Sequence, residues 1–185
     1  MAQITITEAL AGLRTTDKKI EKKQEFILTH LVRQAKLKDP LVQQGGSLQA
    51  IAQEMQAFRD LQEYKVKIRR RINEANLANT ITTHGQTRAI ADWLIWRRDV
   101  APMLQEFHGK LANNIDSARR QAAVRGVNVI GGNVAAVAAA AQPEDVEVHL
   151  DEKQLAETRE KLESLLGELD GLLSLRNATI TIESD

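Results

Sequence analysis

The sequence contains no cysteine, and this absence limits its chemistry. Without cysteine there is no disulfide framework, no thiolate nucleophile and no cysteine-ligated zinc site. Aromatic residues are also scarce, at 3% of the 185 residues, so the core must be built from Leu, Ile, Val and Ala. Aliphatic side chains favour the packing of helix on helix. The chain is therefore expected to be helical and to belong to a reducing compartment.

Two further absences concern membranes and nucleic acids. No run of 18 or more apolar residues occurs, and the N-terminus lacks the charged-then-apolar layout of a signal peptide. We therefore expect no membrane partner and a cytoplasmic location. Lys plus Arg and Asp plus Glu are equal at 25 each, so the chain as a whole has no excess positive charge to attract nucleic acid.

Motifs of catalytic, cofactor or metal sites are missing as well. The four histidines have no paired spacing on a helix, and no carboxylate completes a metal-binding set with them. No P-loop, dinucleotide-binding fingerprint or nucleophile elbow occurs. We expect no catalytic residue, no metal and no cofactor, and predict that the protein is not an enzyme.

Regular spacing of apolar side chains is the strongest positive signal. Thr5 and Glu8 have the spacing of a capping box that starts a helix. This helix carries a seven-residue apolar series at Ile6, Leu13, Ile20 and Ile27. Asp39-Pro40, followed by Gly45-Gly46, is expected to end it.

A second and a third helix follow. The second opens at Ser47 and reaches about Asn79, and it should pair with the first as a hairpin. A tight connection at residues 80–86 leads to the third helix, which extends from about Ile90 to Arg125. The apolar face of the third helix is wide enough to imply contacts on two sides.

The C-terminal third of the chain has a different composition. Residues 126–145 read as a Gly/Ala/Val-rich connection. Residues 146–185 read as a strand, a helix capped by Asp151 and a second strand, and Ile4 to Ile6 alternate in the same way as these strands.

The predicted fold is therefore mainly α. Residues 1–125 form a three-helix, coiled-coil-like body with a long antiparallel helical hairpin, 126–145 form the connection, and 146–185 form an appendage. Short strands of the C-terminal region and the N-terminus add a small β element, and all parts pack as a single domain.

Polar and aromatic side chains gather at the expected bend between the second and third helices. Amides, hydroxyls and a cation near a helix N-terminus suit a sugar-phosphate or nucleotide, and an aromatic plane beside a guanidinium can hold a base. Turn capping explains the same amides and hydroxyls, and packing or an interface explains the tryptophans. The candidate ligand-binding residues are Asn73, Asn76, Thr82, His84, Arg88, Trp93, Trp96, Arg97 and Arg98.

Four other arginines are secondary candidates for anion binding. Arg69 and Arg70 belong to a basic run in the second helix, and Arg119 and Arg120 lie near the end of the third. Solvated cations on a coiled coil and favourable interaction with a helix dipole are the alternative explanations.

The region of the bend also carries a resemblance. It comprises Ile72-Asn73-Glu74-Ala75-Asn76, Thr80 to Thr83, Gly85-Gln86-Thr87-Arg88 and Trp93-Leu94-Ile95-Trp96-Arg97-Arg98, with Lys38-Asp39-Pro40 and Gly45-Gly46-Ser47 before it. Over roughly residues 1–110 the chain resembles small helical proteins of uncharacterised function encoded by tailed bacteriophages and prophages. The resemblance implies a phage origin and the cytoplasm of a bacterial host.

Three functions suit a small helical oligomer of viral origin. We rank first the sequestration of a small anionic nucleotide-derived ligand, such as a host immune signal of the cyclic ADP-ribose type. Such an anti-defence sponge would enclose its ligand at the bend between subunits of a homo-oligomer. The alternative is a virion structural or assembly protein that acts through coiled-coil contacts, and binding of nucleic acid ranks third because the net charge is zero.

Overall fold

Helix α1 (Ile6–His30) begins at the capping box that the sequence predicted. The backbone N–H of Thr5 donates to the Glu8 carboxylate at 2.8 Å, and the backbone N–H of Glu8 donates to Thr5 Oγ1 at 3.2 Å. The bonds from Thr5 hold the pKa of the Glu8 carboxyl below its usual value. Two N–H groups that a helix start leaves without partners are thereby satisfied, and the predicted cap is confirmed.

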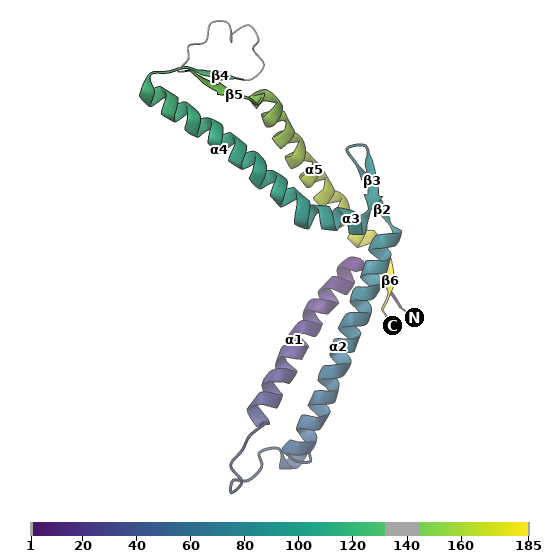
Figure 1. The fold of residues 1–185 in the computed structure, drawn as a ribbon. Coiled ribbons are helices and arrows are strands. Elements are labelled where there is room, and N and C mark those ends of the chain that lie inside the picture. The colour runs from purple at the N-terminus through teal and green to yellow at the C-terminus, as the bar shows by residue number, and fades with distance from the viewer. Residues whose placement is uncertain (1, 132–144, 185) are drawn as a thin grey trace. The chain divides into compact units, whose positions relative to one another are not determined.

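The computed structural model describes residues 2–131 and 145–184, and the chain divides into two compact units (Figure 1). Unit 1 contains the chain up to Asn79 and again from Leu173 onward, and unit 2 contains Thr80–Leu172. One boundary follows α2 (Ser47–Ala78), and the other falls within α5 (Glu152–Thr179). The boundaries expected near residues 125 and 146 both lie inside unit 2.

Unit 1 pairs α1 with α2 and joins the two ends of the chain. The span of α2 agrees with the predicted one. β1 (Gln3–Thr5) runs antiparallel to β6 (Thr181–Glu183), with Ile4 opposite Ile182, so the predicted β element forms within one chain. The core of the unit lies beside this strand pair and consists of Ile6, Ala9, Leu13, Ile68, Ile72 and Ile182.

Helix α1 ends at His30 and not at the expected Asp39-Pro40 turn. Leu31 and Val32 are exposed, so a continued helix would have had no neighbour on which to bury them. A short 3₁₀ helix, η1 (Val42–Gln44), lies in the loop that follows. Asp39 stabilises this loop, because its carboxylate accepts hydrogen bonds from Leu41 N–H at 2.9 Å, Ser47 N–H at 2.8 Å and Ser47 Oγ at 2.6 Å.

The two long helices of unit 1 are antiparallel. Lys23 forms an ion pair with Glu54 at 2.6 Å, and Asp17 forms one with Lys65, so later residues of α1 meet earlier residues of α2. The large apolar side chains of the stripe are most deeply buried near the β1–β6 pair, where Leu13 is 3% and Ile68 1% exposed. Toward the loop, Leu28 is 70% and Leu48 88% exposed. Continuous coiled-coil packing along the hairpin stays a prediction.

Unit 2 begins with a β-hairpin where the sequence suggested only a tight connection. β2 (Thr80–Thr83) pairs antiparallel with β3 (Gln86–Ala89), and His84-Gly85 forms the turn between them. His84 has φ 47° and Gly85 φ 74°, the left-handed values that a two-residue hairpin turn requires at both positions. The β-branched residues before the turn therefore lie in a strand.

The third helix is interrupted near its start. A π-helical segment, η2 (Trp96–Val100), separates α3 (Ile90–Ile95) from α4 (Ala101–Arg125). Pro102, at the first turn of α4, has no N–H to donate backward, and the wider turn before it accommodates this loss. Gly126 ends α4 with φ 71°.

Helices α4 and α5 are connected through a parallel strand pair. β4 (Val129–Gly131) lies beside β5 (Val146–Val148). The remainder of the predicted connection, residues 132–144, lies outside the described residues. Asp151 caps α5 as expected, because its carboxylate accepts hydrogen bonds from the N–H groups of Lys153 and Gln154.

The fold is thus mainly α with small β elements, which confirms the predicted class. Among the described residues, none of the helices combines the length and apolar character needed to cross a membrane.

Asp39 gives the α1–α2 loop a stability that depends on pH. Hydrogen bonds from Ser47 and Leu41 lower the pKa of its carboxyl group to about 2, whereas an unfolded chain holds it near about 3.9. Because the folded value is the lower one, the ionised carboxylate stabilises the loop above about pH 4, and this contribution is lost as the pH falls through about 2. We expect NMR titration of Asp39 to give a midpoint near 2. Asp39→Asn should remove the change in the Ser47 amide protection factor between pH 4 and pH 2, and an Asp39 midpoint near 4 would contradict the interpretation.

Candidate functional site

The predicted ligand-binding residues are divided between the two units. Asn73, Asn76, Arg69 and Arg70 belong to α2 in unit 1, and the others belong to unit 2. Asn76 is only 6% exposed, and its Oδ1 has no hydrogen-bond partner among the described residues. Arg70 forms an ion pair with Glu74, whereas Arg69 and Asn73 line a hollow of about 80 Å³ beside α1.

Within unit 2 the structure brings Arg88, Trp93 and Trp96 together. Trp93 is 1% exposed, and its Nε1 donates to the carbonyl of Ile81 at 3.1 Å. The Arg88 guanidinium lies 4.8 Å from the centre of the Trp93 ring, and Trp96 meets that ring edge-on at 5.6 Å. Trp93 thus ties the β2–β3 hairpin to α3, and its ring has no free face for a ligand in this form.

The other polar candidates between Thr82 and Arg98 are hydrogen-bonded or ion-paired with neighbouring side chains. Arg97 pairs with Asp170 at 2.7 Å, and His84 pairs with Glu168 at 3.2 Å. The hydroxyl groups of Thr82 and Thr87 lie 2.8 Å apart across the hairpin.

Arg98 is bound to its neighbour in sequence. Two hydrogen bonds of 2.7 and 2.8 Å join its guanidinium to Asp99. They raise the pKa of Arg98 and lower the pKa of Asp99. The Arg98–Asp99 pair lies within the π-helical segment, whereas the Arg97–Asp170 and His84–Glu168 pairs join this segment and the hairpin to α5.

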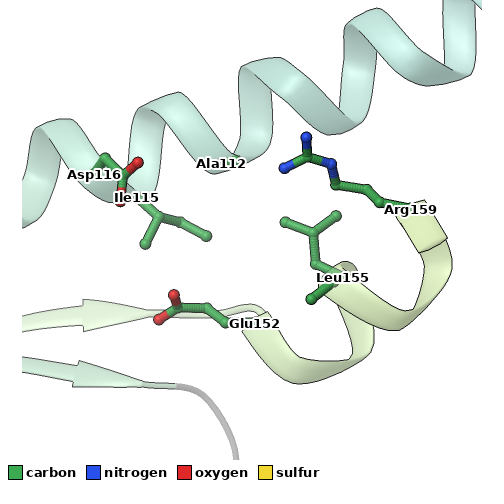
Figure 2. Close-up of a pocket in the computed structure, with 7 residues that line it drawn as sticks. Ala112, Ile115, Asp116, Glu152, Leu155 and Arg159 are labelled. Atoms are coloured by element: carbon green, nitrogen blue, oxygen red, sulfur yellow. The ribbon is translucent and has the colours of Figure 1, made fainter.

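A narrow groove lies between α4 and α5 in unit 2, and sequence reasoning did not find it. One hollow in it has a volume of about 110 Å³. Figure 2 shows its lining, in which Arg159 faces α4 while Asp116 and Glu152 lie at the other end. Arg159 also lines a second hollow of about 90 Å³, beside His108 and Glu163. No sequence signal connects these residues, because they come from helices about fifty positions apart.

The groove has unusual polar groups but little volume. In the described part of the chain, Arg159 has no hydrogen-bond or ion-pair partner, and the buried Nδ1 of His108 has none either. Nucleotide and cofactor sites usually enclose about 300–1,000 Å³. These hollows fit a group of a few atoms, such as a carboxylate, and not a nucleotide.

A basic hollow occupies the last turns of α4. Arg120 and Arg125 line it with Ser117 and Gln121, and its volume is about 370 Å³. Neither arginine has an ion-pair partner within residues 2–131 and 145–184. Arg119, the other predicted cation of this helix, instead pairs with Glu152 at the start of α5.

An apolar hollow of about 330 Å³ lies between α1 and α2 in the half of the hairpin near the loop. It is lined by Gln24, Ile27, Leu28, Met55 and Phe58. The sequence placed one of these residues, Ile27, on the seven-residue apolar series of the first helix. The pattern did not show that Leu28, beside it, stays exposed.

Comparison with known proteins returns no relative. No protein-family model, curated protein or solved structure matches the chain. The phage origin therefore stays a prediction. In the described ranges, no group of three or more His, Asp or Glu side chains is placed to hold a metal ion.

Trp93→Phe tests whether Trp93 has a packing role. The change keeps an aromatic ring but removes the indole N–H, so the Ile81 carbonyl loses its buried donor. We expect the free energy of unfolding to fall by about 1–3 kcal/mol in chemical denaturation. Trp96→Phe is the matched control, because Trp96 is half-buried and has no hydrogen bond from its indole within the described structure. Equal losses in the two variants would contradict a special role for Trp93.

Proposed function

We propose that the protein is a non-catalytic helical assembly protein that works by associating with copies of itself. The observation that supports this proposal is an apolar stripe that continues along α1 and α2 beyond the part that the chain itself buries. Ile68 and Leu13 are covered, whereas Leu28 is 70% and Leu48 88% exposed among the described residues. Burying such side chains against another helix is strongly favourable, at about 1.5–3 kcal/mol for each one fully buried.

Unit 2 carries a second uncovered apolar surface. Met103 and Phe107 lie one turn apart on α4 and are 60% and 55% exposed, and Ile95 is exposed in α3. Contiguous apolar patches of this kind are uncommon on proteins that remain monomeric. The wide apolar face predicted for the third helix agrees with this exposure.

Assembly of a virus particle, which the sequence suggested as an alternative, belongs to this class of function. It requires association through helix faces and no bound ligand. The proposal includes that role and extends to any other structure that the protein builds from copies of itself.

The mass of the protein in solution tests the proposal. Light scattering and sedimentation over a hundredfold range of concentration should give a multiple of the 20.6 kDa chain mass. The association should persist at high salt, since burial of apolar surface is not screened by ions. A mass of one chain at every concentration would overturn the proposal.

Ligand sequestration remains a second candidate function, and the basic hollow at Arg120 and Arg125 favours it. Two unpaired guanidinium groups beside a hydroxyl and an amide suit a phosphate-bearing ligand. The site differs from the bend at which the sequence located the ligand.

Calorimetry with cyclic and linear ADP-ribose derivatives tests this second candidate. We expect stoichiometric binding without turnover, weakened about tenfold or more by Arg120→Ala or Arg125→Ala, each of which removes a charge-assisted hydrogen-bond donor. Arg98→Ala is the control, because Arg98 is exposed but already bound to Asp99. Binding that is unaffected by the first two changes would exclude this hollow as the site.

A further inference from the structure

The open half of the α1–α2 hairpin has the features of a specific interface. We call the surface lined by Gln24, Ile27, Leu28, Met55 and Phe58 the distal face. Leu48 lies two helical turns before Met55, so it extends the same apolar surface along α2. A helix that packed into this hollow would complete the burial that the other half of the hairpin achieves within the chain.

Two charged side chains flank the distal face, one on each helix. Glu21 lies three residues before Gln24 and seven before Leu28, so it is on the same side of α1 as the hollow. Arg59 lies four residues after Met55, on the corresponding side of α2. Both are exposed, and neither has an ion-pair partner among the residues that the structure describes.

Glu21 and Arg59 also lie at the same level of the hairpin. In an antiparallel helix pair, residues at the same level have numbers whose sum is nearly constant. This sum is 77 for the ion pair Lys23–Glu54 and 82 for Asp17–Lys65. The sum for positions 21 and 59 is 80, between these two values. The distal face is therefore apolar in the centre, negative along α1 and positive along α2 at one height.

We propose that the occupant of the distal face is the distal face of a second copy of this chain, related by a two-fold axis parallel to the hairpin. This operation lays α1 of each copy over α2 of the other, so each Glu21 meets the partner copy's Arg59 at the same level. The apolar side chains of both copies then form the core of an antiparallel four-helix bundle. This inference rests on the proposed self-association and specifies its surface and orientation.

Charge complementarity selects this orientation. A two-fold axis perpendicular to the helices would lay α1 over α1 and α2 over α2, and Glu21 would no longer face Arg59. Opposite charges at the rim of an apolar interface fix its register and reject like-charged arrangements. Of the two arrangements, only the one with α1 on α2 brings Glu21 to the partner's Arg59.

Substitutions in the distal face test the surface. Leu28→Asp should convert the dimer to a single chain in sedimentation experiments, because a carboxylate cannot be buried unpaired in the apolar centre. Leu28 is 70% exposed, so the isolated chain should keep its fold, which circular dichroism checks. Leu175→Asp is the matched control, because Leu175 of α5 is 59% exposed and belongs to neither apolar surface described above, and it should leave this dimer intact. A Leu28→Asp protein with the mass of the wild type would overturn the inference.

Exchange of charges tests the orientation. Glu21→Lys and Arg59→Glu should each weaken dimerisation by roughly tenfold or more, since each change places like charges together twice in the dimer. An equimolar mixture of the two variants should form a heterodimer with affinity near that of the wild type, because Lys at 21 then meets Glu at 59 and each unchanged residue meets its original partner. No recovery in the mixture would overturn the orientation.

The same measurements separate this inference from the proposed function. A wild-type protein that is monomeric at all concentrations removes both. A wild-type oligomer that Leu28→Asp does not dissociate leaves self-association standing and overturns the distal face as its interface. Dissociation by Phe107→Asp alone would assign the association to α4 and overturn the inference in the same way.

Discussion

Burial of aliphatic side chains beside the joined chain ends is the interaction on which unit 1 depends. Ile6 and Leu13 of α1 pack with Ile68 and Ile72 of α2, and Ile182 of β6 covers them. The antiparallel strands β1 and β6 bring that residue from the far end of the sequence. Because these buried side chains lie at one end of the hairpin, the two helices are packed most tightly there. The opposite half retains exposed apolar side chains.

Several polar residues predicted to bind a ligand at the bend make contacts within the protein instead. The sequence correctly suggested that Arg88, Trp93 and Trp96 lie near one another. The β2–β3 hairpin supplies a carbonyl acceptor to the buried Trp93, and α5 supplies carboxylates to His84 and Arg97. Arg120, Arg125 and Arg159, which have no ion-pair partner among the described residues, lie elsewhere in unit 2.

An assembly function gives a physical reason for the exposed stripes. In the half of the hairpin near the loop, apolar side chains still recur at helical spacing, and the described residues leave Leu28 and Leu48 largely exposed. Their arrangement between a negative and a positive edge is self-complementary. A protein that acts through such faces needs rigid helices and little else, which agrees with a chain poor in aromatic residues and made of long helices.

The sequence alone predicted those features that depend on residues close together in the chain. The capping box at Thr5, the span of α2, the cap at Asp151 and the alternation of the terminal strands depend on residues a few positions apart. Tertiary structure decided where α1 ends, which half of the apolar stripe is buried and which arginines are paired. Those outcomes depend on partners from distant elements, such as Ile182 against α1 and Asp170 against Arg97, and no spacing within a single helix specifies them.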